Sequence, residues 1–311
     1  MALTINTNMA SIQAQHALSS STKSLNSSIE RMTTGYKINS AKDDAAGLAV
    51  ANKMKVKLSS VSVAESNVQL GSSMLDTIEG NYEVIQDHLQ RIRDLTEQSA
   101  NGTYSSDSLT AISSEISQRL DEITRVANST EYNGLYLLNG DLGEKGKKGL
   151  DLQVGITSST NSVIHLDGSL FNSIQASALT WMVKAKNTDG KDVDATGMKQ
   201  QEFADTCAGL GTKTNLEGTH GANQMLAVLD KAIATITERT TLLGATQNRL
   251  ESASDALQVQ SDNLTSSLST VRDGDVASES SAYISAQILQ SASASLLSTA
   301  NQTPSIALNL I

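Results

Sequence analysis

A strict seven-residue repeat of apolar side chains runs through the last third of the chain. Its members stand at Leu229, Ile236, Leu243, Leu250, Leu257, Leu264 and Val271. A second ladder with the same period lies far upstream, at Met54, Val61, Val68, Leu75, Tyr82 and Leu89, with companions at Ala64, Gly71, Ile78, Ile85 and Ile92. This period keeps one apolar seam of a helix facing a partner along its whole length. We therefore expect two long helices that bury their seams against each other, which brings both ends of the chain together in a rod.

The composition favours helices of this length. Aromatic residues make up only 3% of the 311 residues, and the single proline is Pro304. Because proline interrupts a helix interior at a cost of about 3 kcal/mol, its absence elsewhere leaves long helices unbroken. The spacing of apolar residues predicts helices over about 46–100, 106–128, 222–271 and 276–300. Alternating apolar and polar residues predict hairpin strands between about 135 and 167.

The helices expected at the two ends of the chain have thin apolar seams. Residues 1–40 are rich in Ser, Thr and Asn, which lowers their intrinsic helix propensity. If the chain folds back on itself, we expect Leu18, Leu25 and Met32 to face apolar residues such as Leu289 and Leu296. Such seams are weak in one pair of helices and gain stability when many copies pack together.

These patterns predict a mainly α fold. We expect a long antiparallel α-helical coiled-coil or bundle rod formed by both chain ends, with a β-hairpin region and a small α+β variable domain inserted in the middle. The expected division is terminal helices over 1–45 and 272–311, a helical rod with β-hairpins over 46–167 and 222–271, and a surface-exposed variable domain over 168–221. In that last range the periodicity is weak and glycine-containing turns are common.

Charge and hydropathy argue against two classes of partner. The formal net charge of −10 leaves no basic stripe to neutralise phosphates, so we expect no nucleic acid. No apolar run approaches the roughly 20 residues that span a bilayer, so we expect no membrane insertion. The stretch from Met1 to Asn8 lacks the basic and apolar regions of a removable signal peptide. Any secretion is therefore expected to use a route that does not read such a signal.

The residue types that carry catalysis are scattered. The histidines, His16, His88, His165 and His220, have no metal-ligand spacing. The single cysteine, Cys207, excludes an internal disulfide framework and a cysteine-rich zinc site. We expect no enzymatic activity, no metal and no cofactor. Only an unrecognised site within 168–221 would support an enzyme.

Ordered motifs at both ends of the chain resemble bacterial flagellins. Near the start these are residues 5–8 (INTN), 27–35 (SSIERMTTG), 39–49 (NSAKDDAAGLA), 89–95 (LQRIRDL) and 116–134 (ISQRLDEITRVANSTEYNG). Near the end they are residues 286–289 (AQIL) and 300–302 (ANQ), just before Pro304. The resemblance covers roughly 1–165 and 222–311, whereas residues 168–221 resemble no known pattern.

The resemblance implies a structural subunit of the flagellar filament, which serves motility. Family members leave the cell unfolded through the flagellar type III export channel and polymerise at the distal tip. The expected partners are other copies of the chain, an export chaperone, and the hook-associated and cap proteins, and the expected location is extracellular, in the bacterial flagellum. A hook-associated junction protein of the same superfamily remains an alternative, as does a flagellin scaffold with an enzymatic insert in 168–221.

The resemblance also implies two sets of functional residues. The terminal helices would form the core of the filament, with a self-assembly set at Leu18, Leu25, Ile29, Met32, Ile284, Ile288, Leu289 and Leu296. Toll-like receptor 5 of a host would recognise the monomer through residues that match its flagellin contact motif, at Arg91, Leu95 and Glu115.

Overall fold

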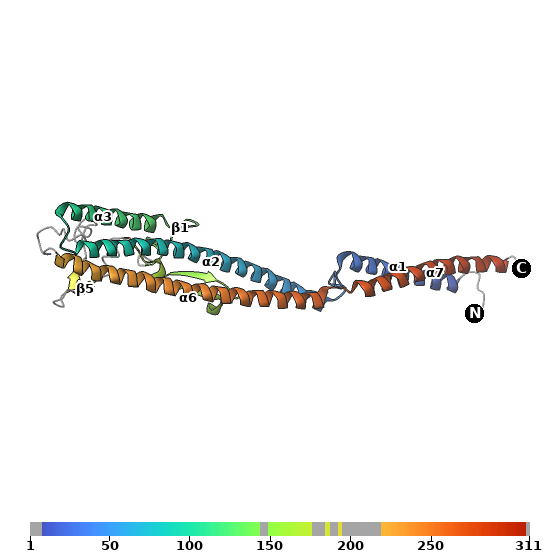
Figure 1. Cartoon of the computed structure of the whole chain (residues 1–311). Helices are drawn as coiled ribbons and strands as arrows, with labels where there is room; N and C mark the ends of the chain where they lie inside the picture. Colours follow the sequence, from blue (N-terminus) through green and yellow to red (C-terminus); the bar gives the residue numbers. More distant parts are fainter. Residues whose placement is uncertain (1–7, 144–148, 176–183, 187–191, 195–218, 309–311) are drawn as a thin grey trace. The chain divides into compact units, whose positions relative to one another are not determined.

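The protein is largely helical and divides into two compact units. The computed structural model describes residues 8–143, 149–175, 184–186, 192–194 and 219–308. One unit contains Met1–Ser60 with Gln260–Ile311, and the other contains Val61–Val259. The long helices are α1 (Met9–Thr34), α2 (Ala45–Ser99), α3 (Ser106–Ser129), α6 (Thr219–Arg272) and α7 (Val276–Leu308) (Figure 1). The predicted fold class, mainly α with small antiparallel strand pairs, is confirmed.

Among the described residues of the second unit, the strands form three antiparallel pairs. They are β1 (Glu131–Tyr132) with β2 (Leu135–Tyr136), β3 (Gly149–Gln153) with β4 (Val163–Asp167), and β5 (Lys184–Lys186) with β6 (Asp192–Asp194). Short 3-10 helices, η1 (Thr160–Ser162) and η2 (Gly168–Phe171), flank β4. The β1–β2 turn is Asn133-Gly134, with φ angles of 50° and 81°, a backbone that Asn and Gly tolerate best. The hairpins predicted from residue 135 onward therefore begin a few residues earlier.

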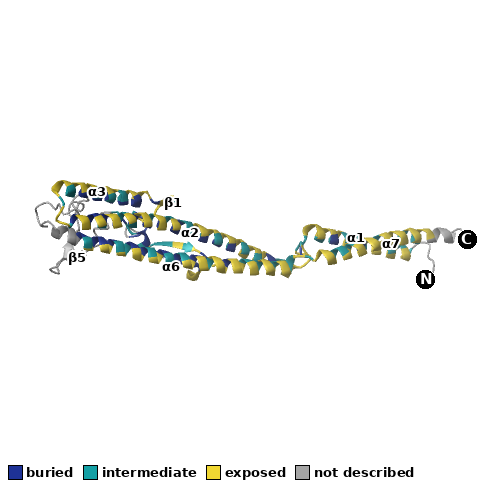
Figure 2. Ribbon diagram, in the orientation of Figure 1, coloured by how far each residue is buried: buried dark blue, intermediate teal, exposed yellow. Residues whose placement is uncertain are grey.

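Both heptad ladders are buried where they lie in the second unit. Val61, Val68, Leu75, Tyr82 and Leu89 on α2 are all at most 4% exposed. Their counterparts on α6 are equally inaccessible, at Leu229, Ile236, Leu243, Leu250 and Leu257. The predicted seam is thus confirmed as the core of the unit (Figure 2).

Polar contacts define the direction of the α2–α6 pair in this unit. Gln247 Nε2 donates to Asp76 Oδ1 at 3.1 Å and to Glu79 Oε2 at 2.8 Å. Further along, Arg93 Nε donates to Asp230 Oδ1 at 2.6 Å. Because residue numbers fall on α6 as they rise on α2, the two helices run antiparallel.

A third helix covers α2 on another side. The side chain of Ser105 accepts a hydrogen bond from the Ser108 amide and caps the start of α3. The apolar face of α3 is then buried, at Ile112, Ile116, Leu120, Ile123, Val126 and Ala127. This face matches the helical spacing that the sequence predicts for 106–128.

A buried polar pair attaches the segment after β4 to the helices. Tyr82 Oη on α2 donates to the Leu170 carbonyl at 2.6 Å, and Arg239 Nη1 on α6 donates to the Asn172 carbonyl at 3.0 Å. Burial raises the pKa of Tyr82 to about 12, against a smaller opposing effect of the Arg239 charge and its hydrogen bond. Arg239 itself is only 5% exposed. Tyr82 and Arg239 therefore bind the segment after β4 through its backbone carbonyls.

The segment from 168 to 175 belongs to the core of the second unit. Leu170, Phe171 and Ile174 are completely buried. Most of the segment predicted as a variable domain, residues 176–183, 187–191 and 195–218, lies outside the described residues. The fold predicted for it stays a prediction.

In the first unit, α1 packs antiparallel against α7 (Figure 1). Arg31 Nη1 lies 3.1 Å from Glu279 Oε1, and Gln290 Nε2 donates to Thr22 Oγ1 at 3.1 Å. At the other end, Asn8 Nδ2 donates to the Ala300 carbonyl at 2.7 Å. Figure 2 shows that most residues of this pair are exposed, in contrast to the buried ladders of the second unit.

The seam between α1 and α7 differs from the predicted one. Leu18 and Leu25 are half-buried in it, but Leu289 and Leu296 are 57% and 63% exposed, and Met32 is also exposed. The α7 side of the seam consists instead of Tyr283, Ala286, Gln290, Ser293 and Leu297. The two buried members of this set, Ala286 and Ser293, are both small. The prediction was wrong because it assigned the largest apolar side chains of α7 to the intramolecular seam.

The last helix also extends further than predicted. It was expected to end near residue 300, yet α7 continues to Leu308 and includes Pro304. Proline lacks the N–H that would donate to the carbonyl four residues earlier, which here belongs to Ala300. The Asn8 side chain donates to that same oxygen. The penalty is thus a single backbone bond near the helix end, and the helix continues.

Candidate functional site

The predicted assembly residues of α7 form an uncovered apolar face. Ile284, Ile288, Leu289 and Leu296 are between 51% and 63% exposed. They lie on the part of the helix that points away from the seam with α1, together with the exposed Ala292. We call these five residues the α7 apolar face. Large exposed apolar residues that cluster in this way are typical of an interaction surface.

The α1 helix adds fewer apolar groups. Ile29 and Met32 are 43% and 36% exposed, near the end of the helix. Leu18 and Leu25, by contrast, are half-buried in the seam with α7. Six of the eight predicted assembly residues are therefore open on the outside of the pair, and two hold the pair together.

The end of the chain carries no charged side chain. Residues 280–311 contain no Asp, Glu, Lys or Arg, although the whole chain has a formal net charge of −10. A neutral surface can be covered by another molecule without the large desolvation penalty of an unpaired charge. The α7 apolar face is therefore suited to permanent burial.

The predicted receptor contacts lie where α2 and α3 meet. Arg91 Nε on α2 is 3.1 Å from Glu115 Oε1 on α3, and both side chains are partly accessible. Arg119 Nη2 reaches the same carboxylate oxygen at 3.0 Å. His88 Nδ1 lies 3.4 Å from Arg119 Nη1 and completes the cluster. We call these four residues the Arg91–Glu115 patch.

The charge of Glu115 is maintained by its neighbours. Burial alone would raise its pKa, but hydrogen bonds from Arg119 and Arg91, together with their charges, leave the pKa below its usual value. Glu115 is therefore a carboxylate that accepts from two arginines at neutral pH. An ion pair with this exposure contributes little to folding stability.

The third predicted contact has a different environment. Leu95 is only 2% exposed and packs in the core of the second unit. Arg91 and Glu115 lie together on the surface, whereas Leu95 offers almost no side-chain surface of its own. Its position one helical turn after Arg91 supports the backbone that carries the arginine.

Within the described parts of the chain, neither catalytic nor membrane-spanning features emerge. No group of three or more His, Cys, Asp or Glu side chains there is arranged to hold a metal ion. None of the helices there combines the length and the apolar character that crossing a membrane requires. His165 pairs with Asp151 at 2.6 Å on an exposed hairpin, and His88 belongs to the Arg91–Glu115 patch.

Two regions of the chain match the sequence models of a known protein family. The bacterial flagellin N-terminal helical region matches residues 5–142, and the bacterial flagellin C-terminal helical region matches residues 226–311. The chain belongs to the bacterial flagellin family. The family consists of structural filament proteins, not enzymes, so the alternative of an enzymatic scaffold is not supported.

Individual proteins with similar sequences belong to the bacterial flagellum as well. Polar flagellin F of Vibrio parahaemolyticus serotype O3:K6 is 31% identical over 376 residues, with 100% of both chains covered. The flagellar filament 30.7 kDa core protein of Treponema maltophilum is 32% identical over 299 residues, which cover 96% of this chain and 95% of the relative. This flagellin is therefore a structural subunit of the bacterial flagellum, an extracellular structure, and its family polymerises into filaments.

A solved structure shares the fold. It is described as a flagellar hook-associated protein from Vibrio parahaemolyticus, and it matches with a TM-score of 0.58 at 15% sequence identity. The match covers 74% of this chain and 100% of that protein. At this identity the likeness concerns the fold alone.

Proposed function

We propose that this flagellin forms the filament itself, and thereby serves motility, by burying the α7 apolar face against neighbouring copies. The observation that carries the proposal is a cluster of exposed leucine and isoleucine side chains on a helix end without charge. Complete burial of each such side chain contributes roughly 1.5–3 kcal/mol. Four of them in every subunit give an association energy that a growing polymer can use.

The proposal extends to the division of the chain. Residues 1–45 and 272–311 would form the inner core of the filament, 46–167 and 222–271 its wall, and 168–221 its outer surface. Before assembly the same exposed residues, Ile284, Ile288, Leu289 and Leu296, need cover, which an export chaperone would provide on the way to the type III channel. Hook-associated and cap proteins would contact the two ends of the polymer.

A junction protein is the second candidate, because the hook-associated structure from Vibrio parahaemolyticus shares the fold over 74% of this chain. A filament subunit and a junction protein differ in how far they polymerise. Purified monomer added to short flagellin filament fragments as seeds is expected to elongate them into long filaments, as measured by electron microscopy and light scattering. A junction protein would add only a limited layer and stop, so seeds that fail to lengthen beyond such a layer would favour the second candidate.

The monomer is also proposed to bind Toll-like receptor 5 through the Arg91–Glu115 patch. The side chains of Arg91 and Glu115 are accessible and are held in a defined arrangement by Arg119. A planar arginine at the centre of an interface is a common hot spot. The buried Leu95 would contribute indirectly, by holding in place the part of the α2 backbone that carries Arg91.

Substitution of Arg91 tests receptor recognition. Arg91→Ala is expected to weaken monomer binding to the receptor ectodomain about tenfold or more, which corresponds to about 1.4 kcal/mol or more. Surface plasmon resonance measures the affinity, and circular dichroism checks that the helix content is unchanged. The matched control is Arg125→Ala on α3, which removes an exposed arginine that pairs only within its own helix, with Glu122. Undiminished binding by Arg91→Ala would remove the patch from the recognition site.

A further inference from the structure

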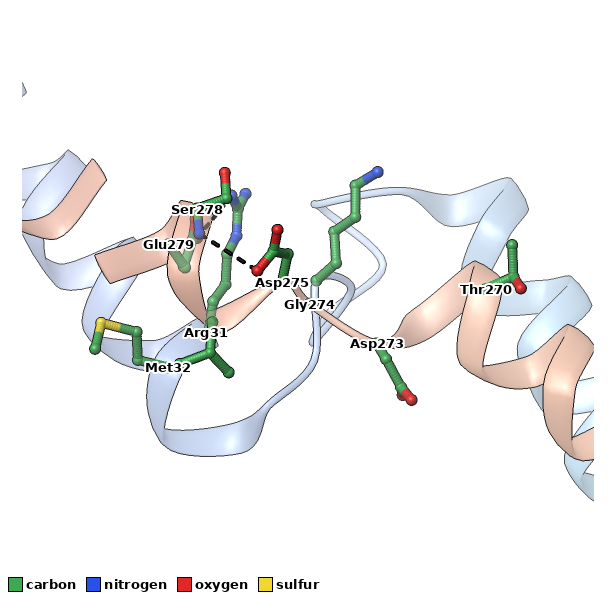
Figure 3. Close-up of a pocket in the computed structure, with 10 residues that line it drawn as sticks. Arg31, Met32, Thr270, Asp273, Gly274, Asp275, Ser278 and Glu279 are labelled. Atoms are coloured by element: carbon green, nitrogen blue, oxygen red, sulfur yellow. Dashed lines mark hydrogen bonds and ion pairs between the residues drawn. The ribbon is translucent and has the colours of Figure 1, made fainter. Parts of the chain in front are cut away.

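A histidine sets the Arg91–Glu115 patch apart from the ion pair near the start of α7. In Figure 3, Arg31 of α1 meets Glu279 of α7 at 3.1 Å beside a pocket. Arginine and glutamate keep their charges across the physiological pH range, so that pair responds little to pH. The Arg91–Glu115 patch also contains His88, and imidazole is the side chain that commonly changes charge between about pH 5 and 8. The patch therefore has two charge states.

His88 is neutral in the observed arrangement. Its Nδ1 lies 3.4 Å from Arg119 Nη1. A guanidinium offers only N–H donors, so Nδ1 must accept, and an accepting ring nitrogen carries no proton. The ring proton of His88 is therefore on Nε2, and the ring has no charge.

The neutral ring of His88 helps to hold Arg119 in place. Arg119 Nη2 lies 3.0 Å from Glu115 Oε1 on the same helix, and Arg91 Nε of α2 lies 3.1 Å from that same oxygen. Arg119 thus has one anchor on each helix, Glu115 on α3 and His88 on α2. The arrangement of the two arginines around Glu115 depends on both anchors, because the bonds form one connected network.

A second acidic group lies near His88. Glu122 follows Arg119 by three positions on α3, so the two side chains occupy the same side of that helix. The hydrogen bond from Arg125 is the largest cause that lowers the pKa of Glu122, and the charges of Arg125 and His88 act in the same direction. His88 is thus close enough to the Glu122 carboxylate for a positively charged ring to be attracted to it.

The charged groups around His88 favour a different partner for each of its states. From α3 these groups are Arg119, Glu122 and, through Arg119, Glu115; on α2 itself they are Asp87, which precedes His88, and Arg91, one turn further. A protonated ring has two donors and no acceptor, so its contact with Arg119 becomes a repulsion between two cations. The attraction of the charged ring to Glu122 acts in the opposite direction.

We infer that His88 is a pH-dependent positioning residue of the Arg91–Glu115 patch: the neutral ring holds Arg119 against Glu115, and the protonated ring releases Arg119 and pairs with Glu122. This exchange of partners is a property of the monomer. Its consequence for recognition rests on the proposed function. Because the acid state adds a positive charge and frees one anchor of Arg119, the patch should bind Toll-like receptor 5 more weakly at pH 5.5 than at pH 7.5.

Nitrogen NMR of the monomer tests the exchange of partners. In protein labelled with ¹⁵N at histidine, the ring signals report which nitrogen carries the proton and at which pH the ring gains its charge. The chain has four histidines, and the signals of His88 are those missing from His88→Asn. At pH 7.5 the proton of His88 is expected on Nε2. A proton on Nδ1 at this pH would overturn the inference.

Two variants separate the two partners of His88. In Arg119→Met the pH at which the His88 signals change should rise by about half a pH unit, since a repelling cation is lost. In Glu122→Gln it should fall by a similar amount, since an attracting carboxylate is lost. The His165 signals serve as the internal control and should not move, and circular dichroism checks the helix content of each variant. Shifts of the same sign, or no shift in either variant, would contradict the exchange.

Receptor binding at pH 7.5 and pH 5.5 tests the consequence for recognition. The matched control is His88→Asn, whose amide oxygen accepts from Arg119 but does not titrate. The loss of affinity on acidification should be about three- to fivefold greater for the unsubstituted protein than for His88→Asn, as measured by surface plasmon resonance. An equal loss in both proteins would remove His88 from the control of recognition. Absence of binding at pH 7.5 would instead contradict the proposed receptor function, and the NMR result would be unaffected.

Discussion

Filament growth is expected to fall about tenfold or more when Ile288 and Leu296 are both replaced by aspartate. Each substitution removes an exposed apolar side chain from the α7 apolar face and introduces a carboxylate where a neighbouring copy would exclude water. Burial of an unpaired carboxylate is far more costly than the apolar contact it replaces. The elongation rate of seeded filaments, followed by light scattering and electron microscopy, measures the effect. Removal of residues 276–311 should abolish growth completely and leave a soluble monomer that keeps much of its helix content.

The matched control has the same charge on another face of the same helix. Ser291 and Ser298 are exposed but lie outside the α7 apolar face. Ser291→Asp with Ser298→Asp should keep most of the elongation rate. If both double variants stop growth equally, the effect is one of charge anywhere on α7. If Ile288→Asp with Leu296→Asp grows normally, the apolar face does not drive assembly.

The second large effect concerns the stability of the unit Val61–Val259. Arg239→Met keeps the length of the side chain but removes the charged donor to the Asn172 carbonyl. Leaving this carbonyl, which lies beside the buried Arg239, without a charged donor is expected to lower the free energy of unfolding by about 2–3 kcal/mol. In a unit of this size the midpoint of thermal unfolding should fall by about 5–10 °C. Circular dichroism of the monomer during heating measures the change.

Two further variants separate the buried pair from a general effect of charge. Arg249→Met removes an exposed arginine from the same helix and should leave the unfolding midpoint unchanged. Tyr82→Phe removes only the donor to the Leu170 carbonyl and should cost about 1 kcal/mol. Equal thermal unfolding midpoints for Arg239→Met and the unsubstituted protein would show that Arg239 does not stabilise the unit.

The strongest sequence signal concerned the long helices, and it succeeded for a simple reason. A heptad repeat produces an apolar seam that is buried by packing against a partner helix of similar length. Residues such as Leu75 and Leu243 are removed from water in this way. Their complete burial follows from periodicity alone. The bounds of α2 and α3, Ala45–Ser99 and Ser106–Ser129, lie within a residue of the predicted ranges because Asn101-Gly102 and Ser105 are strong local signals.

Periodicity failed where the apolar residues of a helix do not mark its partner in the same chain. On α7 four large aliphatic side chains, Ile284, Ile288, Leu289 and Leu296, are exposed, whereas the buried residues of the seam are the small Ala286 and Ser293. A rule that assigns apolar residues to the inside assumes that one chain buries everything it can. Under the proposed assembly that assumption fails, because other copies of the chain would cover the apolar residues that one chain leaves exposed.

The contact of Arg272 with the Tyr36 ring and the hydrogen bonds of Tyr82 and Arg239 to the segment after β4 could not be predicted from the sequence. Each contact joins separate elements of the chain, and no local sequence pattern predicts it. Tyr82 was identified as a member of a heptad ladder, but its hydroxyl depends on a carbonyl after β4. Of the candidate receptor contacts, Arg91 and Glu115 form an ion pair, but the motif could not reveal that Leu95 is buried.

The contacts between Asn8 and Ala300 span 292 positions of sequence, and those between Arg31 and Glu279 span 248. When the chain emerges with its first residue leading, α1 is therefore present long before the residues of α7 that pair with it. Because α1 ends at Thr34 and α7 begins at Val276, the two helices cannot pair until the residues between them have arrived. The contacts of α2 with α6 span only 171 and 137 positions, so we expect them to form before the contacts between α1 and α7.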